Sequence, residues 1–250
     1  MVMPRSQSHP RGPSTGQKPL ARPAPPRRHR LATRTLALLL TGALAGCAPF
    51  GTGSRPAEPP PRGAVAQTPA GAQCLRELSA TGADFTPLPD RSFEQGCSLL
   101  NTVRIASVSS DEASLMVTNL GPATCEVSRA FAAWARFGAD RAAQQLLGSP
   151  LRSIETFGSY SCRNVAGSGR RSAHCTGAAI DVSAFVLEDG RRITVRQGWN
   201  GGSAQEREFL RVVQNSACRR FATVLGPEYN AAHHDHFHFE GVARGRSYCR

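Results

Sequence analysis

The sequence lacks any pair of cysteines in the spacing Cys-x-x-Cys, although the chain contains eight cysteines. That spacing is typical of thiolate zinc sites and of thioredoxin-like redox motifs, so its absence argues against both. The chain also lacks an apolar run of the roughly 20 residues that a membrane-spanning helix needs. The apolar run at residues 36–44 is too short, and no internal repeat is present.

Acidic side chains are absent from the first 50 residues, which hold eight arginines and lysines. This segment carries +8 of the formal net charge of +12, and the rest of the chain therefore carries only +4. Its basic residues form no stripe interleaved with aromatic residues, the pattern expected of a nucleic-acid-binding surface. We therefore expect no nucleic-acid partner.

Residues 1–46 have the pattern of a disordered leader followed by a secretory signal peptide. A basic segment precedes the apolar run at 36–44, and small residues precede Cys47. Leu44-Ala45-Gly46-Cys47 resembles the lipobox of bacterial lipoproteins, in which the cysteine is lipidated. The alternative is an ordinary signal cut near Ala45 that leaves Cys47 as a thiol. We favour lipidation, which predicts a periplasmic protein of the bacterial cell envelope that Cys47 anchors to a membrane, with the outer membrane favoured.

A Pro-rich tether at residues 47–73 is predicted to connect this anchor to a folded domain at residues 74–250. Export to an oxidising compartment suits disulfide bonds. If Cys47 carries lipid, seven cysteines remain, and an odd number leaves at least one unpaired. We expect six of the seven to pair, in an arrangement that the sequence does not determine.

The domain mixes helical and strand patterns. We predict strands at residues 97–108, 112–120, 152–160, 177–187 and 191–196, helices at 124–148 and 203–225, and a last strand that runs through the histidines to about Val242. Ser203 and Glu206 form a capping box at the start of the second helix. Because strands and helices do not alternate in a βαβ rhythm, we expect an α+β fold with an antiparallel sheet and flanking helices.

Histidines of the predicted mature chain fall into two places. They are His174 and the group His233, His234, His236 and His238. Side chains alternate along a strand, so His236 and His238 share one face while Phe237 and Phe239 share the other. If the phenylalanines bury the strand, they mount two imidazoles rigidly on its opposite face. For His233 and His234, an orienting role and simple exposure to solvent remain equally open.

Asp181 lies inside the apolar run "AAIDVSAF", seven residues after His174. A buried carboxylate is costly unless a cation pairs with it. An arginine could be that cation. A zinc ion is the other candidate, because catalytic zinc sites usually take three His, Asp or Glu ligands and a water.

The segment Ser172-x-His174-x-x-Gly177-x-Ala179-x-Asp181 resembles a motif of the zinc peptidases of the lysostaphin, D-Ala-D-Ala carboxypeptidase and hedgehog group. This resemblance implies a hedgehog/D,D-peptidase-like zinc domain. It implies that Zn²⁺ is held by His174, by Asp181 and by the second histidine of His236-x-His238.

The segment "GSYSCR" resembles a further motif of that group, which implies that Arg163 stabilises negative charge on the substrate. The whole span 74–250 resembles the bacterial extensin-like C-terminal domain family, through "GSYSCR", "AIDVSAF", "VLGPEYNAAHHDHFHFE" and the final "YCR".

Two positions depart from the pattern. Cys175 directly follows the predicted ligand His174, and could be the odd thiol, a bridge to Cys162 or a competing soft ligand. The general base is either His236, as in members with His-x-His, or Asp235, which occupies the place of a glutamate in the carboxypeptidases.

Together these features predict a zinc-dependent hydrolase of peptidoglycan stem peptides, acting at D-amino-acid bonds. In the implied chemistry zinc lowers the pKa of water toward neutrality, and Arg163 stabilises the oxyanion. The alternative is a non-catalytic cell-wall-binding or structural lipoprotein that keeps the fold and the metal site. Periplasmic zinc storage is disfavoured, because the histidines alternate with predicted core residues instead of forming a flexible run.

Overall fold

The structure, a computed structural model, describes residues 68–250. Its strands are β1 (Asp84–Pro87), β2 (Arg91–Ser92), β3 (Ser98–Leu99), β4 (Thr102–Ser109), β5 (Ser114–Thr118), β6 (Ala123–Thr124), β7 (Leu151–Gly158), β8 (Ala179–Leu187), β9 (Arg192–Thr194), β10 (Thr223–Leu225), β11 (Phe237–Glu240) and β12 (Tyr248–Cys249). Its helices are α1 (Pro69–Ser79), α2 (Cys125–Trp134), the π-helix η1 (Ala135–Asp140), α3 (Arg141–Leu147), the 3-10 helix η2 (Ala173–Thr176), α4 (Val195–Gly201), α5 (Ala204–Ala217) and the 3-10 helix η3 (Ala231–His233).

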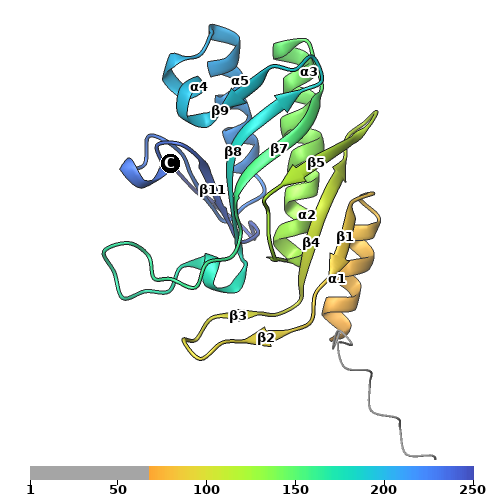
Figure 1. The fold of residues 1–250 in the computed structure, drawn as a ribbon, viewed down its shortest axis with the longest axis vertical. Helices are drawn as coiled ribbons and strands as arrows, with labels where there is room; N and C mark the ends of the chain where they lie inside the picture. Colours follow the sequence, from red (N-terminus) through yellow and green to blue (C-terminus); the bar gives the residue numbers. More distant parts are fainter. Residues whose placement is uncertain (1–67) are drawn as a thin grey trace, which may run out of the picture. The chain divides into compact units, whose positions relative to one another are not determined.

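Ten of the strands form one large sheet (Figure 1). Its order is β1-β4-β5-β7-β8-β11-β10-β12, with β6 also paired to β4 and β9 to β8. The α+β class and the flanking helices are confirmed, but the sheet is mixed and not antiparallel throughout. The pairs β5–β7 and β10–β12 are parallel. The chain between β5 and β7 passes through α2 and α3, and a helical crossover of this kind returns a strand in the same direction.

Helices α2, α3 and α5 lie behind the sheet in the view of Figure 1 and bury one of its faces. Trp134 of α2 stands at the centre of this core, where its ring contacts those of Phe131, Phe185 and Phe239. Its indole N–H donates a hydrogen bond to the carbonyl of Val213 in α5, at 2.9 Å. This bond satisfies the one polar atom that the buried indole carries into the core.

The predicted alternation along the last strand is confirmed. Phe237 and Phe239 are completely buried, and the ring of Phe239 stacks on that of Phe221. His238 lies between them in sequence and therefore projects from the opposite face of the sheet. This is the face that the large helices leave uncovered.

The predicted helix at 124–148 is present and ends at Gly148, which takes the left-handed conformation at φ 70°. Its middle is a π-helix, which the sequence pattern does not indicate. The capping box of Ser203 and Glu206 is also present at the start of α5. The extension of that helix to Leu225 is wrong, because α5 ends at Ala217 and residues 223–225 form β10, which pairs with β11. Residues 223–225 form hydrogen bonds with the neighbouring strand instead of continuing the helix.

Three disulfides join Cys74 to Cys125, Cys97 to Cys162 and Cys218 to Cys249. Within residues 68–250 the cysteine without a disulfide is Cys175, which is buried. The expectation that six of seven cysteines pair is therefore confirmed.

Helix α1 begins at Pro69, inside the segment assigned to the tether, and the Cys74–Cys125 bridge ties it to α2. The predicted leader, the lipobox with Cys47 and the rest of the tether lie outside the described residues. In residues 68–250 no helix has the length and apolarity needed to cross a membrane.

Candidate metal centre

The segment from Ser172 to Gly177 folds into a short 3-10 turn that presents His174. The Ser172 hydroxyl caps the turn by accepting a hydrogen bond from the backbone N–H of His174, at 3.3 Å. Gly177 ends the turn at φ 65°, and a Cβ at this position would lie 2.9 Å from the carbonyl oxygen of Pro122. Ser172 and Gly177 thus each have a local structural role in the motif. Ser172 caps the turn, and position 177 requires a glycine because of its positive φ and the nearby carbonyl.

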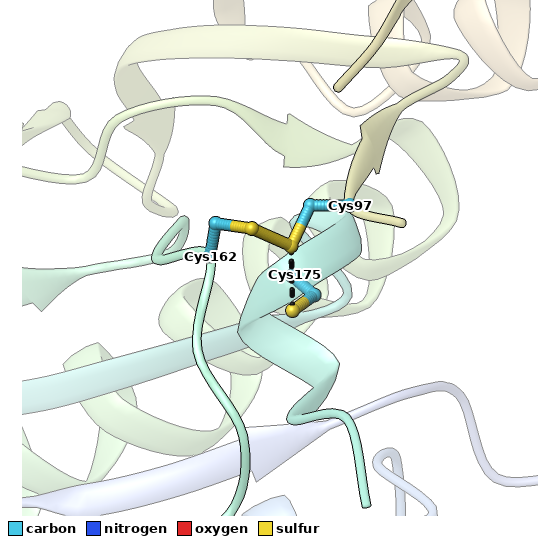
Figure 2. Close-up of side chains that lie close together, drawn as sticks. All are labelled: Cys97, Cys162 and Cys175. Carbon is cyan, nitrogen blue, oxygen red and sulfur yellow. Dashed lines mark hydrogen bonds between the residues drawn. A yellow bond between two sulfur atoms is a disulfide. The ribbon is translucent and has the colours of Figure 1, made fainter. Parts of the chain in front are cut away.

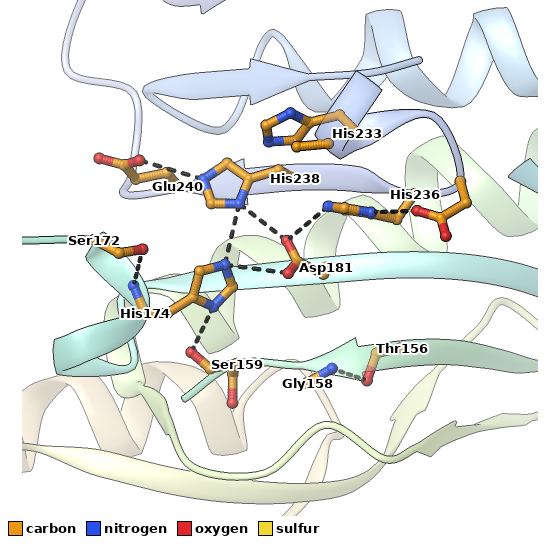
Figure 3. Close-up of polar contacts among 12 residues, drawn as sticks. Thr156, Gly158, Ser159, Ser172, His174, Asp181, His233, His236, His238 and Glu240 are labelled. Carbon is orange, nitrogen blue, oxygen red and sulfur yellow. Dashed lines mark hydrogen bonds and ion pairs between the residues drawn. The ribbon is translucent and has the colours of Figure 1, made fainter. Parts of the chain in front are cut away.

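Strands β8 and β11 bring Asp181 and His238 face to face as register partners. His238 Nδ1 lies 2.9 Å from Asp181 Oδ1, and His174 Nε2 lies 3.2 Å from Asp181 Oδ2 (Figure 3). The nitrogens of the two imidazoles that face Asp181 are 3.2 Å apart. The side chains of His174, Asp181 and His238 are only 4%, 13% and 8% exposed. The structure thus gathers the three predicted metal ligands into one buried cluster.

Each of the two histidines uses its other ring nitrogen to reach an oxygen outside the cluster. His174 Nδ1 lies 3.0 Å from the carbonyl oxygen of Ser159, and His238 Nε2 lies 3.3 Å from Glu240 Oε2. If a metal ion is bound, protons on these two outward nitrogens would leave the nitrogens that face Asp181 unprotonated and able to coordinate it. Metal-binding histidines typically have a partner of this kind, which fixes the ring and its tautomer.

Ser159 and Glu240 were not predicted as parts of the site. Glu240 could have been found, because it follows His238 by two residues and so shares its face of the strand. Ser159 acts through a backbone carbonyl, which carries no signal in the identity of the residue.

The spacing and chemistry of the cluster fit a zinc ion. Tetrahedral zinc with bonds of about 2.0–2.2 Å separates its ligand atoms by roughly 3.3–3.5 Å. The two imidazole nitrogens are 3.2 Å apart, and they lie 2.9 and 3.2 Å from different oxygens of Asp181, Oδ1 for His238 and Oδ2 for His174. Two imidazoles and one carboxylate also form a donor set that zinc accepts. An arginine partner for Asp181 is not seen, since its charged contacts in residues 68–250 are histidines.

The negative charge of the carboxylates in and beside the cluster also favours binding of a cation. Burial raises the pKa of Asp181, but hydrogen bonds from His174 and His238 outweigh it and hold this pKa well below its usual range. Burial lowers the pKa of His238, but hydrogen bonds to Asp181 and Glu240 raise it to about 9. The pKa of Glu240 is lowered by its hydrogen bond with His238. Two carboxylates thus stay charged, and either a proton on His238 or a metal ion compensates them.

The two candidates for a general base occupy different positions. His236 Nε2 lies 3.6 Å from Asp181 Oδ1, so the ring of His236 faces the cluster. Its other ring nitrogen, Nδ1, lies 2.9 Å from Asp235 Oδ1. The ring of Phe157 packs edge-on against His236, at 5.8 Å between centroids. Asp235 therefore orients His236 and does not face the cluster itself.

The structure separates the two histidines whose roles were open. The ring of His233 lies 5.2 Å from that of His236 and 5.7 Å from that of His238, centroid to centroid. Burial and the two neighbouring imidazoles lower its pKa to about 4, so His233 is neutral at pH 7. The side chain of His234 is 55% exposed, and its Nδ1 lies 2.8 Å from the carbonyl oxygen of Ala231. His233 is part of the site, whereas His234 faces solvent.

A cleft of about 290 Å³ opens onto the cluster. His233, His236, His238 and Asp181 line it together with Arg163. The guanidinium predicted to meet negative charge on a substrate therefore shares the cleft with the predicted ligands and base. Arg170 and Arg171 also line this cleft, so three arginines contribute positive charge to its lining.

A comparison with known protein families gives a match. The sequence profile of a family described as "Extensin-like protein C-terminus" matches residues 72–250. This span contains every residue of the cluster and of the cleft. No curated protein and no solved structure matches the chain.

Proposed function

We propose that this chain, which belongs to the extensin-like protein C-terminus family, is a zinc-dependent hydrolase of peptidoglycan stem peptides at the cell envelope. One observation carries the proposal. The ligand atoms of His174, Asp181 and His238 lie within 4.8 Å of one another, beside a further imidazole that faces them.

These three side chains would hold the zinc ion. Three protein ligands is the number that catalytic zinc sites use, whereas structural sites are closed by four. When bound, zinc acts as a Lewis acid that polarises a carbonyl and lowers the pKa of water toward neutrality. His236 is outside the group of mutually close ligand atoms, which leaves it available for proton transfer.

His236 is the general base of the proposed reaction. Its Nδ1–H donates to Asp235, which keeps Nε2 unprotonated and directed toward the cluster. From this position Nε2 accepts a proton from the attacking water and then gives it to the leaving amine. Asp235 positions the ring through this hydrogen bond.

Arg163 supplies positive charge on the wall of the same cleft. A guanidinium stays protonated at all relevant pH values and offers several N–H donors. It therefore suits an oxyanion that develops on the carbonyl of the scissile amide.

We extend the proposal to fold and location. The motif from Ser172 to Asp181, followed by His236-x-His238, supports a hedgehog/D,D-peptidase-like zinc domain. The lipobox at Cys47 supports a lipid anchor that holds the domain at a bacterial membrane facing peptidoglycan, with the outer membrane favoured.

Incubation of the purified protein with muropeptides, with and without a zinc chelator, tests the function. We expect a zinc-dependent product that is lost in His174→Ala and kept in His234→Ala, whose side chain faces solvent on the same segment. A wild-type protein that gives no zinc-dependent product, or a His174→Ala variant as active as wild type, would refute it. Binding of muropeptides without cleavage would favour the non-catalytic wall-binding lipoprotein instead.

A further inference from the structure

Three cysteines meet beside the candidate metal centre. Cys97 is bonded to Cys162, and Cys97 Sγ also lies 2.8 Å from Cys175 Sγ. Figure 2 shows Cys97 Sγ between the other two sulfur atoms. Cys97 and Cys175 are each only 1% exposed, whereas Cys162 is partly exposed. A thiol is therefore held in contact with the buried sulfur of a disulfide.

We propose that these three cysteines form a thiol–disulfide exchange site with two alternative pairings. The Cys175 thiolate attacks Cys97 Sγ, so that a Cys97–Cys175 bond forms as the Cys97–Cys162 bond breaks. The electron pair of the broken bond stays on Cys162 as a thiolate. The proton lost by Cys175 is balanced by the proton that Cys162 takes up from solvent. The number of disulfides does not change, and the exchange needs no external oxidant or reductant.

Chain entropy does not select between the two pairings. The Cys97–Cys162 bond closes a loop with a sequence separation of 65, and a Cys97–Cys175 bond would close one of 78. Because loop-closure entropy grows only with the logarithm of loop length, these two loops cost nearly the same. Local contacts around the three sulfur atoms therefore decide which bond is present.

The exchange would change which segment beside the cleft is held by a disulfide. Cys162 directly precedes Arg163, and Cys175 directly follows His174. In the present pairing the bridge fastens the Arg163 segment next to β3, and the Cys175 thiol donates a hydrogen bond to the Arg163 carbonyl at 3.1 Å. The alternative bridge fastens the turn of His174 and releases the Arg163 segment. This consequence for the cleft rests on the proposed function, but the exchange itself does not.

Disulfide mapping of the full-length chain in a Cys47→Ser background tests the exchange directly. Arg104 follows Cys97, and Arg163, Arg170 and Arg171 separate Cys162 from Cys175, so trypsin places the three cysteines in different peptides. The unreduced protein is equilibrated at mildly alkaline pH, quenched with acid, blocked with N-ethylmaleimide and digested. We expect both the Cys97–Cys162 and the Cys97–Cys175 peptide pairs. Detection of the Cys97–Cys162 pair alone, after equilibration in the presence of a catalytic amount of small thiol, would overturn the proposal.

Two single variants in the same background give a second readout. In Cys162→Ser we expect a Cys97–Cys175 bridge and no free thiol in the denatured, unreduced chain. In Cys175→Ser, the matched control, we expect the Cys97–Cys162 bridge and likewise no free thiol. Two free thiols per chain in a folded Cys162→Ser protein would contradict the exchange. If this variant does not fold, the peptide map of the chain with all three cysteines decides.

Discussion

His238 lies directly opposite Asp181 on the adjacent antiparallel strands β11 and β8, with His238 Nδ1 2.9 Å from Asp181 Oδ1. A slip of one residue in this pairing would turn His238 toward the helices and a phenylalanine toward the cleft. Burial of Phe237 and Phe239 opposes that slip, because both rings would lose their core contacts. The hydrophobic core thus fixes the register on which the candidate ligand pair depends.

Glu240 should strengthen zinc binding through its hydrogen bond with His238 Nε2. We expect Glu240→Gln to weaken zinc affinity roughly 10- to 100-fold, the range typical of partners of ligating histidines. A competition titration with a chromophoric chelator measures this effect. Glu188→Gln, in the exposed turn after β8, is the control and should bind zinc like wild type. Equal affinity of the Glu240→Gln variant would show that this contact does not orient a ligand.

Zinc affinity should rise with pH. The pKa of His238 is raised to about 9 in the metal-free protein, so this ring is protonated at pH 7 and must lose its proton to bind a metal. From this group alone we expect affinity to increase about tenfold per pH unit below that pKa. Calorimetry in buffers of different ionisation enthalpy should detect the proton released by His238. Affinity that does not change with pH in this range would be inconsistent with His238 as a ligand.

Replacement of His236 should separate catalysis from metal binding. We expect His236→Gln to lower the hydrolytic rate about 100- to 10,000-fold, the usual contribution of a general base. Zinc content should not change, because His236 is not one of the three mutually close ligand groups. Asp235→Asn should have a smaller effect on rate, since Asp235 acts through His236, and His234→Gln should have none. Loss of zinc from His236→Gln would instead identify His236 as a ligand.

Gly177 should be more sensitive to substitution than Gly148, although both have positive φ, 65° and 70°. A Cβ at Gly177 would lie 2.9 Å from the Pro122 carbonyl oxygen, whereas nothing lies within 4 Å of one at Gly148. We expect Gly148→Ala to lower the free energy of unfolding by about 1–2 kcal/mol through backbone strain alone. Gly177→Ala should cost more, because a steric clash adds to that strain. Urea denaturation of the metal-free variants measures the difference, and equal losses would refute the steric part.

Much of the site could be predicted because its signals are local. Ser172 and Gly177 shape the turn that carries His174, and each does so through contacts near in sequence. Phe237 and Phe239 indicate the buried face of β11 by simple alternation, which places His238 on the other face. Patterns of this kind need only the period of a strand or the geometry of a turn.

Other features depend on residues that are distant in the chain. Residues 221–225 continue the apolar pattern of α5, yet Thr223–Leu225 pair with β11, a segment that comes later in the sequence. The two parallel pairings likewise depend on where the chain returns to the sheet. The pattern of neighbouring residues does not show how much such long-range strand pairings stabilise the fold.

The sequence by itself determined the α+β class from its mixture of helical and strand patterns, and its resemblance to the zinc peptidase group implied the three candidate ligands and the two candidate bases. If Cys47 carries lipid, parity also leaves at least one of the other seven cysteines unpaired. Only the tertiary structure decided that His236 faces the cluster while Asp235 contacts the other nitrogen of its ring, and that Ser159 and Glu240 contact the rings of His174 and His238. It also decided that Cys175 is the unpaired cysteine and touches a disulfide. Each of these outcomes is a contact between side chains or carbonyls whose direction is set by packing across several strands, and spacing along the chain does not encode that direction.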